Sequence, residues 1–156
     1  MPYFFDTNSF IVISHYFPER FPSFWERFDR LVAQGRILSC REVLNELSSH
    51  ATRPHQLAWI KANRKIFLAP SLAEQDFVRE IFSIAHFQNL IGERQRATGK
   101  PVADPFIIAA ARVANGCVVT EEARKENAAK IPNVCEHFGI PWMNIEGFME
   151  KEGWKF

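Results

Sequence analysis

Short, mostly apolar runs separated by amphipathic stretches restrict most strongly how this chain can fold. Four such runs have the length and composition of buried strands, at residues 3–5, 37–40, 117–120 and 142–145. Strands that are apolar on both faces are typical of parallel sheets covered by helices on either side. The pattern therefore predicts an α/β fold with a short, mostly parallel sheet of about four strands flanked by helices.

The stretches between these runs have the three- and four-residue spacing of helices. Between the first two runs, Phe24, Trp25, Phe28 and Leu31 recur on one face, and Gly35 follows as a stop signal. Similar patterns predict helices within residues 41–50, 54–67, 71–92, 104–116 and 131–139. A length of 156 residues is sufficient for one core, so we expect residues 1–156 to form a single domain.

Composition excludes several classes of protein. The formal net charge of +1 creates no global positive field, so nucleic-acid binding would need a local patch. The cysteines Cys40, Cys117 and Cys135 are far apart and form no C-x-x-C pair, so we interpret them as reduced core residues. The sequence has neither a secretory signal nor an apolar stretch of about 18 residues, so we expect a cytoplasmic protein without a membrane partner.

Acidic residues recur at one edge of the predicted sheet. Asp6 ends the first strand, and Asp104 opens the helix that leads into the third. Ligands of parallel sheets bind beyond the carboxyl ends of the strands, where these acids lie. Clustered carboxylates are typical of a divalent-cation site with hard oxygen ligands. The other acids at this edge are Glu42, Glu46, Glu121 and Glu122.

Each acid also has a structural interpretation. Asp6 can cap the helix expected after it, and Asp104 followed by Pro105 can be an N-cap with proline in the first turn. The glutamates, taken singly, are typical of solvated helix starts. The structural and metal-binding roles are compatible, because a helix N-terminus favours the ionised carboxylate that a metal needs.

Four motifs occur in an order that resembles the PIN-domain family of metal-dependent ribonucleases, which includes the VapC-type toxins of bacterial toxin–antitoxin pairs. The family's D-T-N is present at residues 6–8, its V-x-x-E-L at residues 43–47 and its A-D-x-x-I-x-A at residues 103–109. Its closing T-x-D appears at residues 120–122 as T-E-E, with glutamate in place of aspartate. Residues 51–100 match no pattern of the family, and the chain is longer than compact VapC-type toxins, which indicates a divergent branch.

The resemblance implies a PIN-like three-layer sandwich that hydrolyses RNA phosphodiester bonds at an Mg²⁺ or Mn²⁺ site. A bound cation lowers the pKa of a water and neutralises charge on the phosphate. The resemblance leaves open whether one or two ions bind, and whether Glu121 or Glu122 completes the site. The residues implied as catalytic metal ligands are Asp6, Glu46, Asp104 and Glu122, with Asn8 and Thr120 orienting them.

Positive charge for an RNA substrate is expected from two segments. One bears Arg53, Lys61, Arg64 and Lys65, and the other is the polar loop with Arg94, Arg96 and Lys100. Both segments are also compatible with ordinary solvated surface. The resemblance further implies a homodimer and an antitoxin partner. The 15 phenylalanines are compatible with an apolar contact surface or with a thick core.

Other functions remain to be weighed against a toxin nuclease. A phosphatase of the HAD type needs a second aspartate two residues after the first, and Asn8 occupies that position. A PIN-like nuclease acting in RNA maturation or on DNA would have the same motifs. An inactive PIN-like interaction module is the third alternative, although unused buried acids of like charge should be lost or paired.

Overall fold

The computed structural model describes residues 1–90 and 102–156, and within them a single sheet has the strand order β3-β2-β1-β4-β5. Every neighbouring pair of strands is parallel. The predicted parallel α/β fold is therefore confirmed. The strands are β1 (Tyr3–Phe5), β2 (Ile37–Cys40), β3 (Phe67–Leu68), β4 (Cys117–Val119) and β5 (Trp142–Met143).

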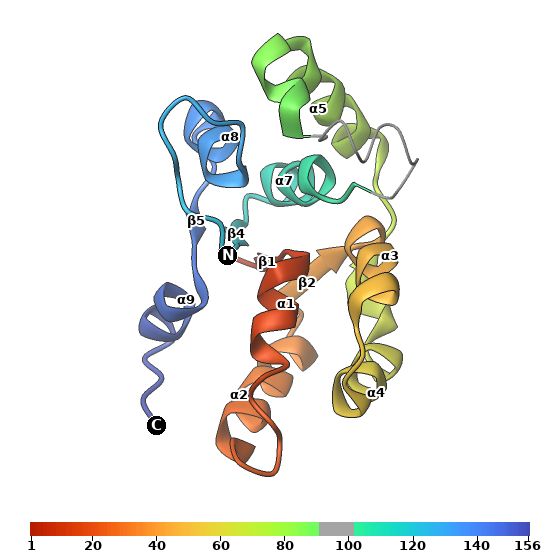
Figure 1. The fold of residues 1–156 in the computed structure, drawn as a ribbon, viewed down its shortest axis with the longest axis vertical. Helices are drawn as coiled ribbons and strands as arrows, with labels where there is room; N and C mark the ends of the chain where they lie inside the picture. The colour runs from red at the N-terminus through yellow and green to blue at the C-terminus, as the bar shows by residue number, and fades with distance from the viewer. Residues whose placement is uncertain (91–101) are drawn as a thin grey trace.

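Helices cover both faces of this sheet and make the molecule three layers thick. Figure 1 shows α5, α7 and α8 on one side of the strands, and α1, α2, α4 and α9 on the other. The described helices are α1 (Thr7–Ile13), α2 (Pro22–Ala33), α3 (Arg41–His50), α4 (Pro54–Ala62), α5 (Leu72–Ser83), α7 (Asp104–Val113), α8 (Ile131–Phe138) and α9 (Ile145–Lys151). Two 3₁₀ turns, η1 (Arg64–Ile66) and η2 (Ala85–Leu90), complete the described elements.

Aromatic side chains fill the core between the sheet and the layer of α2, α4 and α9. The ring of Phe5 on β1 packs edge-on against Phe28 and Phe148, with centroid distances of 5.4 and 5.3 Å. Phe148 is fully buried, and Trp154 packs edge-on against Phe24 at 5.7 Å. Phe148 therefore belongs to the core, which was one of the two roles left open for the phenylalanines, whereas Phe156 is exposed.

The sheet contains a fifth strand that the sequence pattern did not predict. The stretch 54–67 was expected to be one helix, but α4 ends at Ala62 and Phe67–Leu68 pairs in parallel with β2. Two residues are too short to display a strand pattern, and the ladder with β2 is a tertiary interaction. The sheet therefore has five strands, where about four were expected.

Two other boundaries differ from the prediction. The helix expected over residues 71–92 is interrupted at Ile84, whose ψ of 110° is extended, and continues as η2. The last strand stops at Met143, because Asn144 caps α9 by accepting a hydrogen bond from the backbone N–H of Gly147 at 2.8 Å.

The cysteines and the helix lengths agree with the composition. Cys40, Cys117 and Cys135 are free and buried, as expected of core residues. Among residues 1–90 and 102–156, no helix has both the length and the apolar character needed to cross a bilayer.

Candidate metal and catalytic site

The order of the strands places a topological switch point at the carboxyl ends of β1 and β4, and we call the region beyond these ends the crevice. From β1 the chain progresses through β2 to β3 on one side, and β4 and β5 lie on the other. Neighbouring strands whose connections run in opposite directions leave an opening between their following loops, where ligands of such sheets bind. Asp6 and Thr120 both lie at this point, and the Asp6 backbone N–H donates to Val119 at 3.1 Å.

Asp6 caps α1 at the bottom of the crevice. Its Oδ1 accepts a hydrogen bond from the backbone N–H of Ser9 at 2.8 Å, as the capping interpretation predicted. Burial raises the pKa of the Asp6 carboxyl to about 6, although hydrogen bonds from Thr120 and Ser9 lower it. The charge of Glu122 adds to the increase in this pKa. Asp6 is only 4% exposed. Its carboxylate nevertheless accepts the capping hydrogen bond from Ser9 and lies close to Glu122.

Thr120 links Asp6 to Glu122. Its side chain is buried and hydrogen-bonds to Asp6, and its Oγ1 accepts from the backbone N–H of Glu122 at 3.1 Å. Ile131 is the first residue of α8, and its backbone N–H donates a hydrogen bond to Oε2 of Glu122 at 2.9 Å. These contacts hold the loop after β4 against the end of β1.

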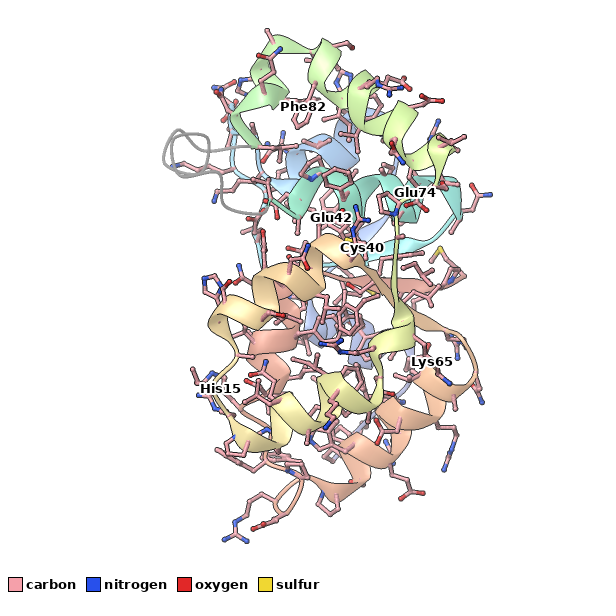
Figure 2. The ribbon with its side chains drawn as sticks, turned by 90° about the vertical axis from the view of Figure 1, so that its right-hand side faces the viewer. His15, Cys40, Glu42, Lys65, Glu74 and Phe82 are labelled. Atoms are coloured by element: carbon pink, nitrogen blue, oxygen red, sulfur yellow. The ribbon has the colours of Figure 1, made fainter. Side chains whose placement is uncertain are left out.

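Glu46 reaches the crevice from α3. Its Oε1 accepts a hydrogen bond from the Thr7 hydroxyl at 2.6 Å, and its Oε2 accepts from the backbone N–H of Ala103 at 2.9 Å. The carboxylate therefore connects the first residue of α1 to the start of α7. Glu42, one turn earlier, is instead paired with Arg41 at 2.9 Å, and Figure 2 shows it near Cys40.

Asp104 lies within electrostatic range of the other three acids. Burial raises its pKa well above the ordinary value, and the charges of Glu122, Glu46 and Asp6 raise it further. Lys130 opposes this effect. The carboxyl was expected to be the N-cap of its helix, and that interpretation was wrong. Ala103 is the N-cap, with no side-chain hydrogen bond, and Asp104 is the first helical residue.

The two glutamates after β4 have different positions. Glu122 is half-buried and close to Asp6 and Asp104, whereas Glu121 is exposed and accepts from the backbone N–H of Ile145 at 2.7 Å. Glu121 therefore stabilises the start of α9. Asn8 is exposed on α1, and no interaction of its side chain occurs among the described residues. Arg94, Arg96 and Lys100 lie outside the described residues.

The carboxylate oxygens of the crevice are ligands that suit a hard divalent cation. The acidic side chains are, however, not arranged around a single ion position. Within the described part of the chain, no group of three or more His, Cys, Asp or Glu side chains is arranged to hold a metal ion directly. Hydrogen bonds keep Glu46 and Glu122 against backbone N–H groups. Mg²⁺ commonly uses one or two carboxylates and keeps several waters, which suits this arrangement.

The structure adds residues to the site that the sequence pattern did not reveal. Ser9 donates a backbone hydrogen bond to Asp6 and uses its hydroxyl to bond Val119 O at 2.9 Å. Lys130, the N-cap of α8, is the cation that opposes the raised pKa of Asp104. It is 26 positions away along the chain (130 against 104), so only the fold brings it close.

The parallel sheet, the helices on both faces and the acids at the switch point define an α/β protein with a PIN-like fold. The fold is similar to the crystal structure of VapBC2 from Rickettsia felis bound to a DNA fragment from their promoter, with a TM-score of 0.51. The identity is 15%, over 92% of this chain and 98% of that chain. The family model described as "Domain of unknown function (DUF4411)" matches residues 3–156, and the chain belongs to that family. No curated protein matches.

Proposed function

We propose that this protein is a metal-dependent endoribonuclease, formed by one PIN-like domain and acting as the toxin of a toxin–antitoxin pair. The observation that carries the proposal is that Asp6, Glu46 and Glu122, near the switch point of the sheet, lie close enough to Asp104 for their charges to raise its pKa. Like charges that raise one another's pKa destabilise the site unless a cation neutralises them. Four carboxylates at this place therefore favour a role that requires negative charge.

In this proposal Asp6 and Asp104 would bind an Mg²⁺ or Mn²⁺ ion, and Glu46 and Glu122 would contact it through water. When bound, the ion activates a water for attack on the phosphodiester and neutralises charge on the phosphate. Thr120 keeps the Asp6 carboxylate oriented and ionised through its hydrogen bond. Thr7 holds the orientation of the Glu46 carboxylate through its own hydrogen bond. Asn8, exposed at the start of α1, is assigned to orienting a water or the substrate.

The context of a toxin is supported by the similarity to VapBC2, which is described as bound to DNA. We propose by analogy that the chain has an antitoxin partner and forms a homodimer. Growth arrest on expression, relieved by coexpression of a neighbouring gene, would be expected. A nuclease of RNA maturation would leave growth unaffected.

Cleavage of total RNA with mapping of the new ends is the decisive experiment. Wild-type protein with Mg²⁺ or Mn²⁺ should produce discrete ends that EDTA abolishes. Asp104→Asn should lose at least about 100-fold in rate, because it removes a charge that binds the ion. Asp76→Asn is the matched control, since Asp76 is an exposed α5 residue paired with Arg79.

Three results would contradict the proposed function. Equal cleavage by wild type and Asp104→Asn would indicate a contaminating nuclease and refute the proposed site. Cleavage of DNA but not RNA would make the protein a deoxyribonuclease. No cleavage of either, together with no thermal stabilisation by Mn²⁺, would favour an inactive interaction module.

A further inference from the structure

Four polar residues meet where the end of α1 contacts the start of α4. Arg53 Nη1 donates to Ser14 Oγ at 3.3 Å, and Arg53 Nη2 lies 3.2 Å from His15 Nδ1. His55 Nε2 lies 2.8 Å from the carbonyl oxygen of Ser14. We call these residues the Arg53 cluster. Figure 2 shows His15 at the margin of the molecule, beside the turn between α3 and α4.

The contacts determine which hydrogen-bonding groups of the cluster remain available. A guanidinium can only donate, so His15 Nδ1 accepts and the ring proton is on Nε2. A carbonyl can only accept, so His55 Nε2 donates to Ser14. His15 is exposed, which leaves its Nε2–H free to donate to a ligand. The half-buried Arg53 is held by Ser14 and His15 before any ligand arrives.

The charge of the cluster is not neutralised within the described residues. Arg53, like the described arginines at positions 20, 27, 64 and 112, has no carboxylate partner there, and it contacts only a hydroxyl and an imidazole. Arg53 is also the N-cap of α4, and no side chain caps that helix. The free N–H groups of the first turn therefore add a positive potential at the same place. The combination is typical of an anion site.

The cluster lies at the other end of α1 from the carboxylates. Thr7, which contacts Glu46, is the first residue of α1, and Ser14 is its C-cap. Seven residues of helix separate the two ends by about 10 Å. Asn8 on α1 and His15, which follows the C-cap of α1, are both exposed. An RNA strand extended along α1 would therefore span the distance of about 10 Å between the carboxylates and Arg53.

We propose that the Arg53 cluster binds a backbone phosphate of single-stranded RNA whose scissile bond lies at the carboxylate crevice. Arg53 and His15 are positioning residues in this inference, which rests on the proposed nuclease function. The carboxylates alone would repel a phosphodiester, so affinity for RNA needs a cation beyond the metal site. A fixed distance between the two sites would also set where along a strand cleavage takes place.

Binding of a short fluorescent single-stranded RNA, measured by anisotropy at several salt concentrations, tests the inference. The Asp104→Asn protein is used as background so that cleavage does not interfere. Arg53→Ala should weaken binding several-fold and reduce the salt slope by about 0.7, the value for one lost phosphate contact. His15→Ala should weaken it less, since a neutral donor is lost. Arg53→Lys should partly restore the slope.

Arg112→Ala is the matched control, because it removes the same charge from α7, on the opposite side of the sheet from α1 and α4 (Figure 1). A melting curve shows whether each variant is folded, and His15→Ala tests an exposed position in case Arg53→Ala is not. Equal losses for Arg53→Ala and Arg112→Ala, or an unchanged slope for Arg53→Ala, would overturn the inference while leaving the nuclease proposal intact. Failure of the wild type to bind or cleave any RNA would refute both.

Discussion

The carboxylate of Glu46 accepts a hydrogen bond from the hydroxyl of Thr7 at 2.6 Å, although 39 positions separate the two residues. Glu46 also accepts from the backbone N–H of Ala103. One side chain of α3 therefore connects the starts of α1 and α7, and these starts carry Asp6 and Asp104. The geometry of the proposed metal site depends on this connection.

Removing the hydroxyl of Thr7 should impair activity more than stability. Thr7→Val leaves Glu46 bonded to Ala103 alone, so we expect a roughly 10-fold or greater loss in the rate of RNA cleavage, typical of outer contacts of a metal site. Thr7→Ser keeps the hydroxyl and should retain most of the rate. Single-turnover cleavage measures this effect. Equal losses in the two variants would show that the methyl group, rather than the hydrogen bond, matters.

Removing the charge of Asp104 should stabilise the metal-free protein. Burial and three neighbouring acids raise the pKa of Asp104, so its ionised form opposes folding at neutral pH. In EDTA, Asp104→Asn should be more stable by roughly 1 kcal/mol, which is about 2–4 °C in Tm for a chain of this size. Millimolar Mn²⁺ should raise the Tm of the wild type and not that of the variant.

Thermal melts with and without Mn²⁺ measure both effects, and Asp76→Asn should leave them unchanged. A variant that melts lower than the wild type in EDTA would contradict the repulsion at the site. A variant that Mn²⁺ stabilises as strongly as the wild type would contradict metal binding by Asp104.

Gly116 precedes β4 at a position where a side chain does not fit. A Cβ there would lie 2.7 Å from both Phe4 Cε2 and the Pro2 carbonyl oxygen. The Pro2 carbonyl accepts from Cys117 N at 2.9 Å, so this backbone cannot easily move. Gly116→Ala should therefore cost about 1–3 kcal/mol in the free energy of unfolding. Urea denaturation should show a lower midpoint with an unchanged m-value.

Gly147→Ala provides the comparison, since its Cβ would have no neighbour closer than 3.3 Å. We expect a small effect there, because alanine also favours the helix α9 in which it lies. A loss at Gly147 as large as that at Gly116 would contradict the steric explanation.

Glu152 should make stability depend on pH in the acidic range. Burial alone would raise its pKa, but hydrogen bonds from Tyr3 and Arg36 outweigh burial and lower it. Tyr3 Oη donates at 2.6 Å, and Arg36 is paired at 2.8 Å. A carboxyl with a lowered pKa contributes stability above its unfolded pKa of about 4.3, and this is lost as the pH falls through the folded value.

Glu152→Gln should therefore be less stable than the wild type at pH 7, and the difference should shrink below about pH 4. Chemical denaturation at a series of pH values measures the difference, with Glu150→Gln as the exposed control. A difference that stays constant from pH 7 to the acid limit would show that the carboxylate charge does not stabilise this junction.

Much of the fold could be predicted from the sequence, because several of its strands have a recognisable apolar pattern. β1, β2 and β4 are runs of three or four residues with strongly apolar side chains, so their burial leaves a visible pattern. β3 has two residues and forms only because β2 lies beside it. The helix is interrupted at Ile84 although no proline or glycine lies beside this residue, so the sequence gives no local signal for the interruption.

The candidate site was likewise predicted from the sequence only in part. The positions of Asp6, Glu46 and Asp104 relative to strands and helices follow from local motifs. The conformation of the loop after β4 decides that Glu122, and not Glu121, is their neighbour. In that loop Glu122 accepts a hydrogen bond from the start of α8, and Glu121 accepts one from the start of α9. The roles of these acids in binding a metal stay predictions, and so does the RNA contact of the loop at residues 94–100.

The sequence by itself determined the alternation of strands and helices and the kinds of side chain at the strand ends, because burial and helix periodicity are local properties of a chain. Only the tertiary structure decided that Lys130 opposes the charge on Asp104 and that Arg53 rests on His15 instead of a carboxylate. Those relationships join residues far apart in the chain, and electrostatic interactions depend on distance in space.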